Sequence, residues 1–412
     1  MKEDSFPAPR IWLVTPFSLP DVDGSPDRFR YIASELHNRG ALVVQYISAF
    51  DHTSKTFRRL GPIPWPCVKI FELGYKRNLS AERLISHIVF SLALPFYLVI
   101  NLLRFGKPDC LFVALPHNGA ACVAAVFAKA LRVRLIVDVH DTWPESILGV
   151  KKLSMWARPF YAFWKRCADF AFLCADDVFA ESARYAERAN IIRYRFGRSR
   201  AQAIYLGGDP AYYQQIQQVK TLPDELRQAT FVVAYVGTLG ENNDLDCILD
   251  AFDSFAKEHR EAGLLFLGGG ERESILRSGI ETLGIRAWVS GRIPHSLLLA
   301  YLKCAKVGLN CFKAGGNVAY SYKLNDYLLS GVPVVNSLIG ESADLIEAQG
   351  LGVNYEAGNP ESLLAALRAC HSQWRTDLSW GKRVMDFSSR CLNRRESYYP
   401  LIQSCLSQSH SY

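Results

Sequence analysis

The 412-residue sequence lacks several patterns that would place it in a common class of protein. Its 11 cysteines include no Cys-x-x-Cys pair, and the residues between Cys167 and Cys174 are mostly apolar, as in a buried segment. Free thiols without such a framework favour a reducing, cytosolic compartment. The first ten residues carry acidic residues and prolines and no apolar stretch, so we expect no signal peptide.

The glycine-rich motifs of two common nucleotide-binding classes are also missing. Neither the loop 16–27 (PFSLPDVDGSPD) nor the segment 235–244 (YVGTLGENND) matches GxGxxG or the P-loop, which argues against a dehydrogenase and an ATPase. With 49% hydrophobic residues the chain is not disordered as a whole. Its net charge of +7 suggests an anionic partner and fits a nucleotide, a phospholipid headgroup or a nucleic acid.

Short apolar runs alternate with helical patterns in both halves of the chain, which predicts an α/β protein with two Rossmann-like, doubly wound parallel-sheet domains facing a central cleft. We expect strands at 11–15, 42–48, 110–115, 135–139, 177–180, 231–236, 264–267, 287–289, 307–310 and 332–336, and helices at 28–38 and 245–258. The predicted domains are 1–205 and 229–390, joined by a linker at 206–228, with 391–412 crossing back to the first domain.

Residues 84–103 form an uncharged apolar run of transmembrane length with basic residues on both sides. A spanning helix would place the strands before and after it on opposite sides of a bilayer. We therefore expect a helix that lies on one membrane face, or one that is wholly buried in the protein.

Two segments carry the candidate chemistry. In RLIVDVHDTWPES, His140 and Asp141 stand at the carboxyl end of an apolar strand, where side chains can hydrogen-bond a substrate. In SYKLNDYLL, Lys323 and Asp326 are three residues apart, so they share a helix face on which the lysine can reach a phosphate and the carboxylate a ribose diol. The alternative for the second pair is a salt bridge on a solvated face.

The ordered set of motifs resembles glycosyltransferase family 4, whose members are retaining enzymes of the GT-B fold that use nucleotide-sugars. The set consists of Gly24, His140-Asp141, Val236-Gly237, the glycines 268–270, the segment 289–292 (VSGR), the segment 321–327 (SYKLNDY) and the segment 331–333 (GVP). It looks closest to the branch that makes bacterial surface polysaccharides (capsule, O-antigen and exopolysaccharide).

The resemblance implies a metal-independent hexosyltransferase without a cofactor. His140 and Asp141 would be catalytic. The donor-binding residues would be Gly24, Ser25, Gly237, Thr238, Arg292, Ile293, Gly316, Asn317, Lys323 and Asp326. A lipid-linked glycan would be the acceptor, with no nucleic acid as partner, and the protein would be peripheral at the cytoplasmic face of the membrane.

The chain departs from the family pattern in two places. The first glutamate of the family's E-x7-E motif is replaced by Val318, and the turn after Gly237 lacks the expected basic residue. Either Lys323 and Arg272 supply that positive charge, or donor binding is weakened. These departures leave two alternatives open: a non-catalytic GT-B scaffold that binds a lipid-linked glycan or a partner transferase, and a GT-B nucleotide-sugar epimerase.

Overall fold

The computed structural model describes residues 8–18, 27–52, 54–59, 61–76, 80–145, 158–315, 318 and 320–407. They form two compact units. The first contains the described residues up to Ile204 together with those from Tyr398 onward, and the second runs from Tyr205 to Ser397.

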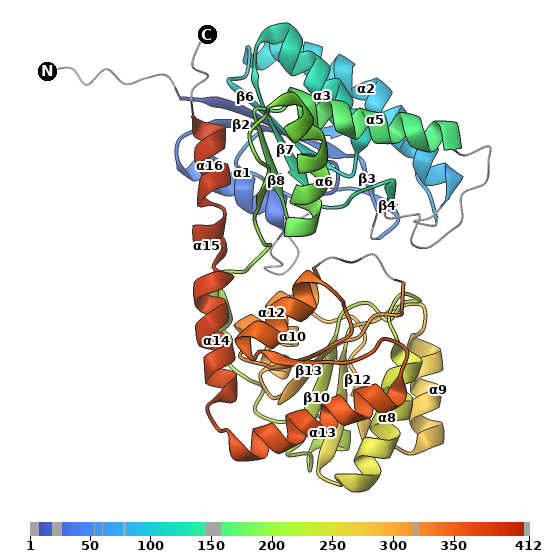
Figure 1. The fold of residues 1–412 in the computed structure, drawn as a ribbon. Coiled ribbons are helices and arrows are strands. Elements are labelled where there is room, and N and C mark those ends of the chain that lie inside the picture. Colours follow the sequence, from blue (N-terminus) through green and yellow to red (C-terminus); the bar gives the residue numbers. More distant parts are fainter. Residues whose placement is uncertain are drawn as a thin grey trace, which may run out of the picture. The chain divides into compact units, whose positions relative to one another are not determined.

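The first unit is built on a seven-stranded parallel sheet in the order β5-β2-β1-β6-β7-β8-β9 (Figure 1). Its strands are β1 (Arg10–Val14), β2 (Leu42–Ser48), β5 (Cys67–Ile70), β6 (Cys110–Leu115), β7 (Arg134–Val139), β8 (Asp177–Ala180) and β9 (Gln202–Ala203). Its helices are α1 (Arg28–Asn38), α2 (Ala81–Phe105), α3 (Asn118–Leu131), α5 (Arg158–Cys174), α6 (Ala183–Arg193) and α16 (Tyr399–Leu406). A small antiparallel ribbon pairs β3 (Phe50–Asp51) with β4 (Thr56–Phe57).

The second unit has a six-stranded parallel sheet in the order β12-β11-β10-β13-β14-β15. Its strands are β10 (Phe231–Val236), β11 (Ala262–Leu267), β12 (Ala287–Val289), β13 (Val307–Asn310), β14 (Val334–Asn336) and β15 (Gly352–Asn354). Its helices are α7 (Pro210–Gln215), α8 (Leu245–Glu258), α9 (Glu273–Leu283), α10 (His295–Leu302), α11 (Tyr322–Leu329), α12 (Glu341–Gln349), α13 (Pro360–Thr376), α14 (Trp380–Cys391) and α15 (Arg394–Ser397).

Apolar residues explain why the central strands form. Every residue of β6, β10 and β11 is buried, as expected for parallel strands that helices cover on both faces. In each sheet the order reverses between neighbouring central strands: β1 lies beside β6, and β10 lies beside β13. Ligands bind outside the carboxyl ends of strands at such a reversal.

The predicted fold class is confirmed, because both sheets are parallel and doubly wound. All ten strands expected in the two large sheets are present, with bounds that differ by one or two residues at some ends. Three further strands, β5, β9 and β15, were not predicted. Their residues are mostly exposed or only partly buried, so no apolar run marks them in the sequence.

The segment 206–228, expected as a linker, lies within the second unit. Tyr213 and Leu226 are buried in that unit's core, so the segment is a packed part of the second unit and not only a connection between the units. At the other end of the chain, Leu401, Ile402 and Cys405 of α16 are buried in the core of the first unit, together with residues of α1.

Helix α2 contains the long apolar run. It is the one helix of the described residues that is long and apolar enough to cross a membrane, and only about 22% of its apolar window is buried. Phe90, Leu94 and Leu98 form its buried face, which packs on α3. Leu92, Phe96 and Leu103 are 66%, 72% and 86% exposed, so the helix is not wholly buried.

Candidate functional site

The turn after β10 lies at the strand reversal of the second sheet. Gly237 has a φ of +116°, and a Cβ there would come within 2.9 Å of the Lys323 Cε, so glycine is required both for the backbone angle and for space. The backbone N–H of Gly237 donates to the Leu267 carbonyl at 2.9 Å. The Thr238 carbonyl accepts from the Tyr235 hydroxyl at 2.8 Å, which fixes the turn.

Lys323, in the first helical turn of α11, lies against the Gly237 loop. Its Nζ donates to the Tyr235 hydroxyl at 2.8 Å and to Asn243 Oδ1 at 2.6 Å. The ammonium also lies 4.2 Å from the centre of the Tyr235 ring and 4.7 Å from that of Phe312. All of these partners are neutral, and burial lowers the pKa of Lys323 to about 7. An anion beside this amine would restore its positive charge.

Asp326 lies one helical turn beyond Lys323. Its Oδ1 accepts from the Tyr213 hydroxyl at 2.7 Å and pairs with His295 Nε2 at 3.1 Å. Burial by itself lowers the pKa of His295, but the hydrogen bond and charge of Asp326 outweigh it and raise that pKa. Among the described residues the carboxylate pairs with His295 and not with Lys323, so the two residues do not form a salt bridge on a solvated face.

The loops after β11 and β12 approach the same turn. A Cβ at Gly268 would lie 2.0 Å from the Gly237 carbonyl oxygen, so only glycine fits there. Arg292 is exposed, and its Cγ would lie 3.2 Å from a Cβ placed on Gly269. Ile293 packs partly against the core. The structure thus gathers Gly237, Lys323 and the glycine loops at one edge of the second sheet.

In the first unit, His140 is held by two carboxylates at the ends of β7 and β8. Its Nε2 lies 2.7 Å from Asp138 Oδ2, and its Nδ1 lies 2.9 Å from Glu181 Oε2. Burial alone lowers the pKa of His140, but Asp138 and Glu181 outweigh it and raise that pKa to about 9. The imidazole is therefore charged at neutral pH.

Asp138 also binds Arg28 at the start of α1. Arg28 Nη2 and Nε donate to the two carboxylate oxygens at 2.8 and 2.9 Å, and Nη1 donates to the Tyr398 hydroxyl at 2.9 Å. Sequence reasoning missed Asp138, Glu181, Arg28 and Tyr398 as parts of this network. The available signal was Asp138 itself, a charged residue inside an otherwise apolar strand.

Two family models match the chain. Residues 230–373 match "Glycosyl transferases group 1", and residues 23–207 match "Glycosyl transferase 4-like domain". The two matches take in most of the chain, one in each half.

The chain belongs to glycosyltransferase family 4.

Solved structures agree with this assignment at the level of the fold. HepE from Anabaena in complex with UDP is 16% identical, with a TM-score of 0.67, and the match covers 96% of this chain and 99% of that one. The lipopolysaccharide outer core galactosyltransferase WaaB is 16% identical, with a TM-score of 0.60 and coverage of 96% and 99%. WaaG, a glycosyltransferase involved in lipopolysaccharide biosynthesis, is 13% identical, with a TM-score of 0.61 and coverage of 94% and 98%. No curated protein matches the sequence significantly.

The structure places only some of the other predicted site residues of this glycosyltransferase. Gly24, Ser25, Gly316 and Asn317 lie outside the described residues. Asp141 follows His140 in the loop after β7 and is partly exposed. Arg272, one of the two residues expected to supply charge near the turn, donates to Asp246 at 2.8 and 3.0 Å, so its charge already has a partner.

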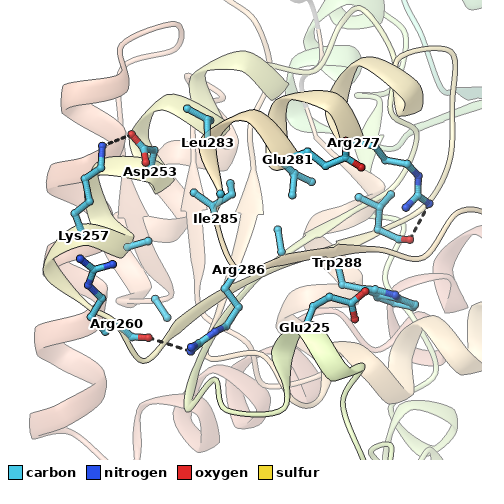
Figure 2. Close-up of a pocket in the computed structure, with 16 residues that line it drawn as sticks. Glu225, Asp253, Lys257, Arg260, Arg277, Glu281, Leu283, Ile285, Arg286 and Trp288 are labelled. Atoms are coloured by element: carbon cyan, nitrogen blue, oxygen red, sulfur yellow. Dashed lines mark hydrogen bonds and ion pairs between the residues drawn. The ribbon is translucent and has the colours of Figure 1, made fainter.

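A cavity of about 710 Å³ lies elsewhere in the second unit of the glycosyltransferase (Figure 2). Its lining includes Ala262 and Ala287, the first residues of β11 and β12, together with Arg260, Arg286 and Trp288. None of the described donor-binding candidates is among its lining residues. The lining runs along the edge strand β12 and not along the strand reversal between β10 and β13, where the fold places a nucleotide.

Proposed function

We propose that this glycosyltransferase moves a sugar from a nucleotide-sugar donor to a polyprenyl-diphosphate-linked glycan, with retention of the anomeric configuration, in the synthesis of a bacterial surface polysaccharide. One observation carries the donor half of this proposal. The Lys323 ammonium, whose protein partners are all neutral, lies beneath the Gly237 turn, with Asp326 on the same helix. A nucleoside diphosphate offers a phosphate to the lysine and a ribose diol to the carboxylate.

The donor-binding roles follow from the chemistry of each group. Lys323 neutralises charge on the departing diphosphate, and the backbone N–H of Thr238 supplements it, because that of Gly237 already donates to the Leu267 carbonyl. Arg292 and Ile293 line the base pocket, and Gly316 and Asn317 hold the sugar. The reaction needs no metal, because the amine and the backbone dipoles supply the positive potential. HepE has been solved with UDP and with UDP-glucose, so uridine nucleotides are the first donors to test.

His140 contributes a fixed positive charge on the acceptor side. Both of its ring nitrogens donate to carboxylates, so it is not available as a proton acceptor. Asp141, the next residue, hydrogen-bonds a sugar hydroxyl. Retention requires the acceptor hydroxyl to attack from the face that the nucleoside diphosphate leaves, and the protein's part is orientation and stabilisation of the leaving group.

The acceptor side meets a membrane through α2. The exposed face of the helix carries six large apolar residues: Ile85, Leu92, Phe96, Val99, Ile100 and Leu103. Val126 of α3 and Phe163 of α5 are 56% and 60% exposed. Helix α3 packs on both α2 and α5 (Figure 1). Exposed basic residues flank the run, with Lys76 before it and Arg104 and Lys107 after it. Such a surface suits the anionic, cytoplasmic leaflet, where a lipid-linked acceptor would lie.

The donor site is tested by thermal shift across UDP-, GDP- and ADP-sugars, comparing wild type with Lys323→Ala. A ligand at a hundred times its dissociation constant stabilises by about 2.7 kcal/mol, which is readily detected. We expect a shift with one donor that is lost in Lys323→Ala and kept in Lys257→Ala, a lysine paired with Asp253 on the surface. No shift with any donor would favour the non-catalytic scaffold, for which the replacement by Val318 is the supporting observation.

A further inference from the structure

Three metal-ligating side chains that have no part in the proposed transfer reaction meet inside the first unit. Glu72 follows β5, His87 lies in the second turn of α2, and His117 directly precedes α3. They are only 2%, 0% and 0% exposed. One ligand atom from each lies within 4.8 Å of the other two.

These side chains lack the partners that buried polar groups normally have. Among the residues that the structure describes, none hydrogen-bonds to either ring nitrogen of His87, to either ring nitrogen of His117 or to Glu72 Oε1. The two imidazoles stack with their centres 4.3 Å apart, so their edges do not bond to one another. A buried polar atom left unpaired costs about 1–3 kcal/mol, so five of them together need a compensating ligand.

The chemical state of the cluster suits a cation. Burial, followed by the charge of Arg83, lowers the pKa of His117 to about 3, and burial lowers that of His87 well below its usual value. Both imidazoles are therefore neutral, the form in which histidine binds metals. The Ser48 hydroxyl donates to Glu72 Oε2, which orients the carboxylate and leaves Oε1 to act as the ligand.

Other charged groups near the cluster do not occupy it. The Arg83 guanidinium lies against the Trp143 ring, 5.2 Å from its centre. Its positive charge disfavours protonation of either histidine and also repels a cation, a repulsion that the Glu72 carboxylate must offset. The charges of Arg83 and Arg58 act on Glu72, and that of His52 acts on His87. The one formal negative charge among the three ligands belongs to Glu72.

We propose that Glu72, His87 and His117 bind one divalent cation of the zinc class, with water as the fourth ligand. Two histidines and one glutamate are an established ligand set for zinc, with bonds of about 2.0–2.2 Å. The three ligand atoms lie within 4.8 Å of one another, so the side chains would draw closer around the cation. The cation joins the end of β5, helix α2 and the start of α3. It therefore fastens the proposed membrane helix to the sheet of the first unit, whereas the proposed donor site belongs to the second unit.

The test uses the full chain expressed in zinc-supplemented medium, with metal content measured by mass spectrometry. We expect about one zinc per chain, as for a dedicated site, and near-complete loss in Glu72→Gln, His87→Asn and His117→Asn. His371→Asn is the matched control, because His259, Glu261 and His371 form the other such cluster, in the second unit. There His371 already bonds to Glu261 at 3.0 Å, so this substitution leaves the zinc content unchanged.

A second measurement needs no variant and so does not depend on whether a variant folds. Wild-type protein stripped with a chelator should lose thermal stability and regain it with zinc ions alone. Stripped protein loaded with cobalt(II) should show the intense visible bands of a tetrahedral site. Three results would each overturn the proposal. They are wild-type protein without bound zinc, no recovery of thermal stability when zinc is added, and a zinc content in His87→Asn equal to that of wild type. None of these outcomes depends on donor binding.

Discussion

Lys323 lies directly beneath Gly237: a Cβ on the glycine would come within 2.9 Å of the lysine Cε. The glycine and the lysine are on different elements, the turn after β10 and helix α11. Their contact makes the shape of the turn and the position of the ammonium interdependent. A substitution of either residue should therefore disturb the donor site.

Gly237→Ala is expected to displace Lys323 and weaken donor binding at least tenfold. The new methyl group needs the space of the lysine side chain, and a φ of +116° strains any residue with a Cβ, at a cost of about 1–3 kcal/mol. Titration calorimetry with the donor measures the first effect and thermal unfolding the second. Gly240→Ala is the control in the same loop, because its Cβ would make only ordinary contacts. Equal behaviour of the two variants would contradict this account of the turn.

Donor binding should weaken as the pH rises above about 7. The pKa of Lys323 in the free protein is about 7, and a bound diphosphate raises it, so the complex holds more protons than the free protein. The affinity is therefore highest below pH 7 and falls by up to tenfold per pH unit above it. Calorimetry in two buffers of different ionisation enthalpy would measure the proton uptake directly. Lys323→Arg keeps its charge throughout and should lose this pH dependence. Binding without proton uptake in wild type would count against the lysine as the phosphate ligand.

Asp326→Ala should abolish turnover while leaving binding to lipid vesicles unchanged. The carboxylate would lose its hydrogen bonds to the ribose, and bonds to a charged group contribute about 1.5–3 kcal/mol each. Radiolabelled sugar transfer and vesicle co-sedimentation are the two measurements. Tyr213→Phe serves as the control, since it removes one donor to Asp326 Oδ1 but keeps the carboxylate. Turnover that survives Asp326→Ala would remove this residue from the donor site.

The first unit should lose stability between pH 7 and 9.5. Folding raises the pKa of His140 to about 9, above its ordinary value of about 6.5. Its contribution is thus fully present below pH 6.5 and is lost as the pH rises through 9, by up to about 3 kcal/mol. Denaturant unfolding at several pH values measures the loss of stability. His140→Gln has no imidazole to titrate, so the variant should not show the part of the pH dependence that His140 causes. A wild-type curve parallel to that of the variant would show that His140 is neutral in the fold.

The exposed face of α2 should bind vesicles that contain anionic lipid. Phe96→Glu combined with Leu92→Glu places two charges on that face and should reduce co-sedimentation at least tenfold without lowering the thermal stability. Leu378→Glu is the matched control, since Leu378 is 95% exposed in the second unit. Membranes washed with carbonate should release the protein. Retention after carbonate would indicate a spanning helix instead.

Local patterns in the sequence were enough to predict the two parallel sheets. The apolar runs of β6, β10 and β11 identify themselves as strands because residues buried on both faces must be apolar wherever the strand lies in the sheet. The motifs around His140 and Lys323 were likewise visible in the sequence, since each stands next to a recognisable strand or helix.

Only the tertiary structure decided what those residues contact. Asp138 binds Arg28, which is 110 residues away, and Arg28 in turn binds Tyr398, which is 370 residues away. The burial that lowers the pKa of Lys323, and the meeting of Glu72 with His87 and His117, likewise join separate elements. Such contacts follow from the order of the strands and the packing of the helices on them, which no local periodicity encodes. The sequence by itself determined where the strands and the candidate residues lie, and the fold decided their partners and charges.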